Sequence, residues 1–159
     1  MYIQLYRGSR GSPPACRKAV RRACASALGE LSLARSVEPL ARALGDQDAD
    51  VRREAASAIG DLDHVTKAPA ALVRATTSLD PDLRRHATKA LAHIGDLATL
   101  QALADRLGDD DKSIRLAAVE GLGEMEVAAA LPGLTRALND RDPEVRRAAA
   151  EALGKTQDN

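Results

Sequence analysis

One segment of this sequence recurs along the chain, and its clearest copy reads Asp142-Pro143-Glu144-Val145-Arg146-Arg147-Ala148-Ala149-Ala150-Glu151-Ala152-Leu153-Gly154. Four further copies drift from it but keep an apolar anchor residue at the position of Val145. The anchors stand 31, 32, 31 and 31 residues apart, at Val20, Val51, Leu83, Ile114 and Val145. A fixed period of this length predicts a stack of similar helical units, a solenoid, instead of a domain with one central core.

Each copy has the pattern of a helix, which we call a B helix. An aspartate stands three residues before the anchor in four copies, where its side chain can accept an unpaired backbone N–H. Apolar residues recur at the anchor and four and eight residues after it, which places them on one helical stripe. We expect B helices near residues 14–31, 49–62, 81–94, 112–125 and 143–155.

Shorter apolar segments between the B helices predict a second set, the A helices. The copy at 64–79 is the weakest, because Thr76 stands where the other copies have leucine and one residue is inserted near 61–67. We expect any bend in the stack to lie there. Residues 1–13 do not fit the repeat and predict an N-terminal arm or cap, either a short helix or a strand-like segment, before a single repeat domain at 14–159.

Charge is balanced overall but not along the chain. Residues 1–45 hold eight basic and two acidic residues, a net charge of +6, which leaves −6 for the rest of a chain whose total is zero. A basic end on an acidic body favours an acidic partner or head-to-tail self-association. The sequence leaves both a monomer and weak self-association open.

Features of exported or membrane proteins are not found in the sequence. Cys16 and Cys24 lie eight residues apart on one predicted helix, about 12 Å, which is too far for a disulfide. No secretory signal or membrane-spanning apolar run is present. We therefore expect a cytoplasmic location and no membrane partner.

The consensus Asp-x-Asp-Pro-x-Val-Arg-x-x-Ala-Ala-x-Ala-Leu-Gly resembles HEAT repeats, specifically the short type named after phycobilisome lyases, over residues 14–156. This resemblance implies an all-α fold, a right-handed α-solenoid of about five helical hairpins with the B helices on the concave side. It also implies a ladder in which aspartates and arginines tie adjacent repeats together. The ladder residues would be Asp48, Asp80, Asp111 and Asp142 with Arg52, Arg84, Arg115 and Arg146.

Positions two, three and six after the anchor face away from the buried stripe, and the resemblance makes them the variable concave positions. The candidate partner-binding residues there are Arg22, Arg53, Arg85, His86, Lys89, Leu116, Glu120, Arg147 and Glu151. We expect Arg53, Arg85 and Arg147 to have no role in packing. They would contact an acidic segment of a partner protein.

Signals of catalysis are weak. His86 and His93 share one helical face but have no third metal ligand, and the His-Glu pairs of the HEAT-type deoxyhypusine hydroxylases do not occur. An acidic body without aromatic platforms argues against nucleic acid. We expect a non-catalytic scaffold that binds a protein or peptide segment, with no metal, cofactor or catalytic residue. The alternative is an auxiliary subunit of a phycobilin-lyase-like or other prosthetic-group-modifying enzyme.

Overall fold

The computed structural model describes residues 14–31, 33–125 and 127–157, and these residues contain helices and no strand. Residues 1–13, the predicted arm or cap, lie outside the described part. Each copy of the recurring segment forms a long helix. The B helices are α1 (Pro14–Glu30), α3 (Ala49–Gly60), α5 (Pro81–Ile94), α7 (Lys112–Glu124) and α9 (Pro143–Gln157).

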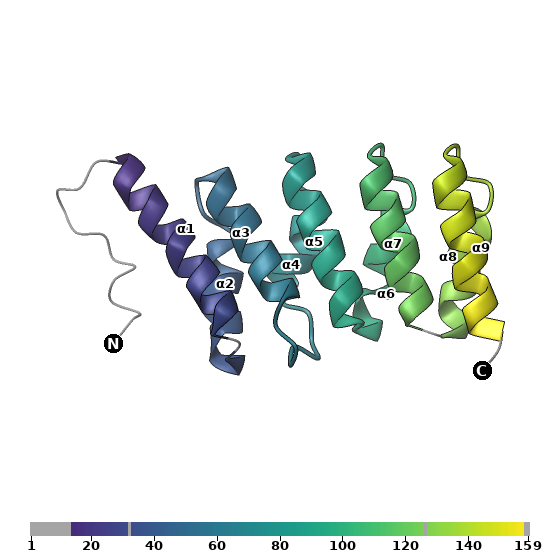
Figure 1. The fold of residues 1–159 in the computed structure, drawn as a ribbon, viewed down its shortest axis with the longest axis horizontal. Coiled ribbons are helices and arrows are strands. Elements are labelled where there is room, and N and C mark those ends of the chain that lie inside the picture. The colour runs from purple at the N-terminus through teal and green to yellow at the C-terminus, as the bar shows by residue number, and fades with distance from the viewer. Residues whose placement is uncertain (1–13, 32, 126, 158–159) are drawn as a thin grey trace.

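The A helices are shorter and lie behind the B helices in Figure 1. They are α2 (Val37–Ala43), α4 (Ala70–Ala75), α6 (Leu100–Arg106) and α8 (Leu131–Ala137). Three of them follow a 3-10 turn: η2 (Ala34–Ser36), η3 (Leu97–Thr99) and η4 (Ala128–Ala130). Each A helix packs on the B helix that follows it, and successive B helices pack side by side. The described part is therefore α1 followed by four hairpins, an elongated α-solenoid of the predicted class.

The aspartates before the anchors start the B helices. Asp48 accepts hydrogen bonds from the N–H groups of Asp50 and Val51, at 2.9 and 3.4 Å. Asp80, Asp111 and Asp142 each bond in the same way to the N–H two residues later. These side chains satisfy backbone donors that have no partner within the helix, which confirms the predicted caps.

The anchors form the core together with one leucine from each A helix. Four anchors and the four leucines are almost fully buried: Val51, Leu83, Ile114 and Val145, and Leu40, Leu72, Leu103 and Leu134. Burying each of these side chains stabilises the fold by about 1.5–3 kcal/mol. The first anchor, Val20, is 49% exposed. It lacks the cover that an A helix gives the other anchors, because no A helix precedes α1 in the described part of the chain.

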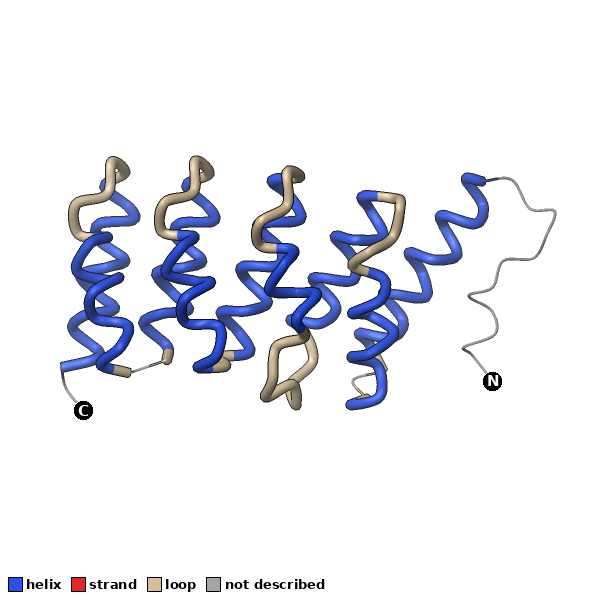
Figure 2. Tube along the Cα trace, turned by 180° about the vertical axis from the view of Figure 1, so that it is seen from behind, coloured by secondary structure: helices blue, strands red, loops and turns tan. Residues whose placement is uncertain are grey.

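The second A helix, α4, departs from the other three. No 3-10 turn leads into α4; residues 61–69 form a longer connection, seen as the large tan loop low in Figure 2. Leu62 and Val65 of this loop are buried. Thr76, at the leucine position, is buried as well and donates its hydroxyl to the Val73 carbonyl at 2.7 Å. A polar residue is tolerated there because this local hydrogen bond satisfies it.

Glycine and alanine meet wherever two B helices cross closely. In three of these junctions the glycine nine residues after one anchor faces the alanine seven residues after the next, in the pairs Gly29 with Ala58, Gly60 with Ala90, and Gly123 with Ala152. At the α5–α7 junction the two residues are exchanged, because Ala92 faces Gly121. A Cβ on Gly121 would lie 2.5 Å from the Cβ of Ala92, closer than packed side chains allow. Ala92, which breaks the repeat in the sequence, is therefore matched by a glycine on its neighbour.

Candidate functional site

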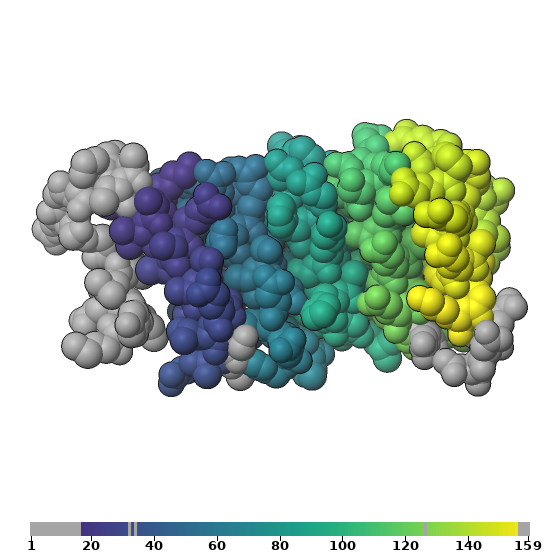
Figure 3. All heavy atoms as spheres, viewed as in Figure 1, coloured from purple at the N-terminus to yellow at the C-terminus, as the bar shows by residue number. Residues whose placement is uncertain are grey.

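The predicted partner-binding residues lie on the solvent-facing surface of the five B helices, which we call the B-helix face. All nine are at least partly exposed: Arg22, Arg53, Arg85, His86, Lys89, Leu116, Glu120, Arg147 and Glu151. Figure 3 views the molecule from the side of the B helices, whose side chains form a continuous surface from α1 to α9. This exposure follows from helical register, because these positions point away from the buried stripe.

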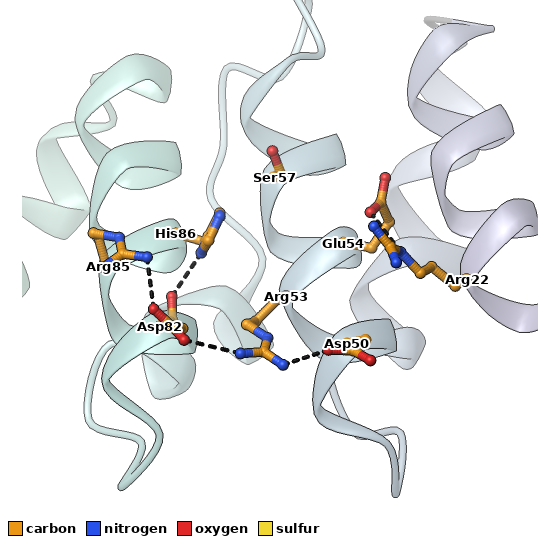
Figure 4. A pocket seen from close by; sticks show the side chains of 8 residues that line it. All are labelled: Arg22, Asp50, Arg53, Glu54, Ser57, Asp82, Arg85 and His86. Carbon is orange, nitrogen blue, oxygen red and sulfur yellow. Dashed lines mark hydrogen bonds and ion pairs between the residues drawn. The ribbon is translucent and has the colours of Figure 1, made fainter. Parts of the chain in front are cut away.

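A shallow polar pocket of about 300 Å³ lies on the B-helix face over α1, α3 and α5 (Figure 4). Arg53 stands between two carboxylates, pairing with Asp50 on its own helix and donating to Asp82 Oδ2 on α5 at 2.9 Å. Asp82 also accepts from Arg85 at 2.6 Å. The residues lining the pocket are Arg22, Asp50, Arg53, Glu54, Ser57, Asp82, Arg85 and His86. The arginines and His86 were predicted to bind a partner, and Glu54 lies at one of the predicted concave positions, but Asp50 and Asp82 were missed.

The ion pairs keep charge in this pocket fixed. The hydrogen bond from Lys18, and after it the one from Arg53, lowers the pKa of Asp50 below its ordinary value. Burial alone would lower the pKa of Arg53, but its hydrogen bond to Asp50 and the charges of Asp80 and Asp50 raise it. Asp50 and Arg53 therefore stay charged around neutral pH. They offer charge and hydrogen bonds to a ligand, and no proton transfer.

A second depression of about 490 Å³ adjoins the first along α1. Ala19 and Ala23 contribute small side chains to it, and Lys18, Arg22, Ser26 and Glu54 supply the polar ones. Arg22 and Glu54 line both depressions and pair with each other at 3.3 Å. The hollowed part of the B-helix face therefore runs across α1, α3 and α5.

The prediction that the arginines of this face have no packing role is wrong for Arg53 and Arg85. The Arg53 side chain is 28% exposed and ties α3 to α5 through Asp82, and Arg85 also bonds to Asp82. Arg147 fits the prediction better, because its side chain is 71% exposed and its ion pair with Glu151 is 3.7 Å long. The difference lies in the acidic residue one position before the anchor: Asp50 and Asp82 pair with these arginines, whereas Glu144 pairs with Lys112.

The arginine after the anchor connects adjacent repeats in three copies, but its partner is not one of the expected aspartates. Arg84 donates to both oxygens of Asp109, at 3.1 and 3.2 Å. Arg115 does the same to Asp140, at 2.8 and 3.1 Å. Arg21 bonds to Asp46 at 2.8 and 3.0 Å. The acidic partner is thus five residues before the next anchor, and not the predicted Asp48, Asp80, Asp111 or Asp142.

The predicted aspartates instead cap their own helices. Asp48 and Asp142 do contact a neighbouring repeat, but through lysines: Lys18 reaches Asp48 at 3.1 Å and Lys112 reaches Asp142 at 3.6 Å. Recurrence of aspartate at 46, 109 and 140 was the signal that could have located the true partners. This signal is weaker than it could be because the equivalent position in the remaining repeat holds Ser78.

The ladder is interrupted at the α3–α5 junction. Arg52 would need a carboxylate at position 78, and Ser78 provides none, so among the described residues Arg52 donates only to the Asp46 carbonyl, at 2.8 Å. Within the part of the chain that the structure describes, Arg146 on α9 likewise bonds only to carbonyls of its own loop, at Asp140 and Arg141. Arg53, on the B-helix face, carries the ion pair that crosses the α3–α5 junction.

The side chains of Asp109 and Asp140 are largely buried and remain ionised. Burial alone would raise the pKa of Asp140, but the hydrogen bonds from Arg115 and from the N–H of Asp142, with the charges of Arg115 and Arg141, lower it. The pKa of Asp109 is lowered in the same way, chiefly by the hydrogen bond from Arg84. The side chain of Asp109 is only 5% exposed, so solvent screens these contacts weakly.

Metal and membrane features are not found in the parts of the chain that the structure describes. Among those residues no group of three or more His, Cys, Asp or Glu side chains could hold a metal ion. His64 and His93 are exposed, and His86 is occupied by a contact of its Nδ1 with the Asp82 carbonyl at 2.7 Å. None of the described helices is long and apolar enough to cross a membrane.

Comparison with known proteins relates this architecture to a family and to two kinds of solved structure. A family model described as HEAT repeats matches residues 15–78, 66–118 and 102–159. A chain of the complex of CpcE and CpcF of phycocyanin lyase from Nostoc sp. is 25% identical, with a TM-score of 0.74 over 89% of this chain and 60% of that one. This chain thus spans three fifths of that lyase chain. A search of the curated proteins gives no significant match.

Engineered solenoids share the fold at lower identity. A designed armadillo repeat protein in complex with the peptide (KR)4 is 20% identical, with a TM-score of 0.68 over 97% of this chain and 80% of that one. An engineered protein is 21% identical, with a TM-score of 0.65 over 96% and 78% of the two chains. Because the family model covers nearly all described residues, the chain belongs to the HEAT-repeat family, with repeats of the short phycobilisome-lyase type.

Proposed function

We propose that this protein is a non-catalytic scaffold that binds a segment of another protein on its B-helix face. The observation that carries the proposal is the hollow across α1, α3 and α5, which adjoining depressions of about 300 and 490 Å³ form. The charged side chains that line this hollow can form ion pairs with a partner, and the small ones leave room for a polypeptide segment. The complex of CpcE with CpcF and the armadillo protein's complex with a peptide are consistent with such a use of the fold.

The cations most available to an acidic partner are exposed ones that the protein pairs weakly or leaves without an ion pair among the described residues. Lys89 is exposed and has no ion pair with any described residue, and the Arg22 side chain is 59% exposed with a long contact to Glu54. Arg53 is held by two carboxylates. Breaking an existing ion pair offsets most of what a new one would contribute. Arg22 and Lys89 are therefore the first contacts that we assign to an acidic segment.

Site-directed charge reversal tests this proposal in a capture experiment from the native source. A photo-crosslinking residue at Ser57, in the pocket, should label the partner, and Arg22→Glu/Lys89→Glu should reduce its capture strongly at low salt and less at high salt. The matched control is Lys67→Glu/Arg74→Glu, which changes the charge equally at exposed residues outside the B helices. Equal capture by both variants, with folding confirmed, would place the binding surface elsewhere.

An auxiliary role in a prosthetic-group-modifying enzyme is the second candidate, and the likeness to the phycocyanin lyase complex favours it. In that role the chain would bind a catalytic subunit instead of a peptide segment. The same capture experiment separates the two functions. Recovery of a second subunit with a chromophore, detected by its visible absorption, would support the auxiliary role, and recovery of a partner without one would support the scaffold.

A further inference from the structure

Charge changes sign along one row of the B-helix face. The residue six positions after each anchor is Ser26 on α1, Ser57 on α3, Lys89 on α5, Glu120 on α7 and Glu151 on α9. Ser57 and Ser26 line the two depressions, and the row continues from them across the B-helix face to α9. The row is uncharged over α1 and α3, basic over α5 and acidic over α7 and α9.

Lys89 and Glu120 are the charges in this row that the protein leaves unused. Both are exposed, and neither forms an ion pair with any residue in the described ranges. Glu151 differs, because it pairs with Arg147 at 3.7 Å. Beside Glu120, one turn earlier on α7, stands the partly buried Leu116, so the surface there is apolar where the other B helices carry arginine.

The spacing of the helices restricts what can contact both residues. Packed helices lie about 8–10 Å apart, so Lys89 and Glu120, at equivalent positions of adjacent B helices, are offset by about that distance. A polyproline II segment rises about 3.1 Å per residue with three residues per turn, which places positions i and i+3 on one side about 9.3 Å apart. In a β-strand, positions i and i+3 point to opposite sides.

From this match we propose that α5 and α7 bind a segment in the polyproline II conformation that carries an acidic and a basic residue three positions apart. The acidic residue pairs with Lys89 and the basic residue with Glu120. The proposal rests on the proposed scaffold function and specifies the partner for the same face. Each contact alone is an exposed ion pair and weak, so recognition depends on both being made in one register.

A matrix of three peptides and three proteins tests the pairing without knowledge of the natural partner. The fluorescent probes are proline-rich octapeptides with the cores Glu-Pro-Pro-Lys, Glu-Pro-Pro-Glu and Lys-Pro-Pro-Lys. The wild type should prefer the first, Glu120→Lys the second and Lys89→Glu the third. We expect each preference to be about three- to tenfold in Kd at low ionic strength and to shrink with added salt. Either chain direction of the peptide gives the same prediction.

Spacing provides the control. A Glu-Pro-Lys peptide, with two-residue spacing, should bind the wild type several-fold more weakly than Glu-Pro-Pro-Lys. The inference would be overturned if affinity did not depend on peptide spacing, or if the preferred peptide did not change with the charge of the variant. Failure of all three peptides to bind would overturn it as well. The proposed function has a separate readout, because partner capture through Arg22 and the crosslinker at Ser57 does not depend on peptide spacing.

Discussion

Replacing Gly121 with alanine tests whether the glycine–alanine junctions set the spacing of the B helices. Alanine is the better helix former by about 1 kcal/mol, so helix propensity alone predicts that Gly121→Ala stabilises α7. The structure predicts the opposite. The new Cβ would lie 2.5 Å from the Cβ and 2.7 Å from the Cα of Ala92, and a backbone atom cannot move aside as a flexible side chain does.

The size of the effect follows from these two opposing contributions. Overpacking a core costs roughly 1–3 kcal/mol, and the two short contacts place this site near the upper end. After the gain in propensity, we expect Gly121→Ala to lower the free energy of unfolding by about 2 kcal/mol. For a chain of this size that corresponds to a fall of roughly 4–8 °C in the thermal midpoint. Urea unfolding followed by circular dichroism measures the first quantity and a thermal scan the second.

Two further variants separate the contact from other effects. Gly154→Ala is the matched control, because nothing lies within 4 Å of a Cβ at that helical position, and it should leave stability unchanged or raise it. Ala92→Gly combined with Gly121→Ala recreates the arrangement of the other junctions. That double variant should recover to within about 1 kcal/mol of the wild type, a strong non-additivity. A Gly121→Ala protein as stable as the Gly154→Ala protein would refute the reasoning.

Three other predictions concern the ladder between repeats and a helix cap. Ser78→Asp should supply the missing ladder carboxylate and raise stability by about 0.5–2 kcal/mol in urea unfolding, and the gain should vanish when Arg52 is also changed to Gln. Because the folded pKa of Asp140 is lowered, its contribution is complete above the unfolded pKa of about 3.9 and is lost as pH falls through the folded value. Asp140→Asn should therefore destabilise the protein at pH 7 but progressively less below pH 4, and equal losses at pH 7 and pH 3 would contradict this. Asp111→Ala should cost about 1 kcal/mol through its helix cap, whereas Asp110→Ala, at an exposed neighbour, should change the thermal midpoint little.

The helices and their caps could be predicted from sequence because they depend on local pattern. Asp48 followed by an apolar residue at Val51 specifies a cap and a buried stripe within a few residues of chain. The ladder depends instead on which oxygen a long arginine reaches in the next repeat. Comparison of the repeats identified the aspartates that recur in four copies. Those aspartates cap their own helices, and the ladder partners Asp109 and Asp140 were missed.

The same limit explains the binding face. Register alone identified Arg53 and Arg85 as exposed, but their carboxylate partner, Asp82, belongs to a different position of the repeat and to the neighbouring helix in the case of Arg53. For a similar reason the repeat pattern does not explain why Ala92 stands where the other copies have glycine. Its compensating glycine, Gly121, occupies another column of the repeat, so only the spatial pairing of the two helices connects them.

The exchange of glycine and alanine between α5 and α7 makes the repeats directional building blocks that cannot be reordered freely. Removing one repeat unit, residues 95–125, would bring Ala92 against Ala152 and join two projecting surfaces with no recess between them. Duplicating that unit would instead place Gly123 against a second Gly121 and leave a gap. Gain or loss of whole repeats is thus tolerated at some junctions and not at others, and the reversed pair fixes the order of the units around it.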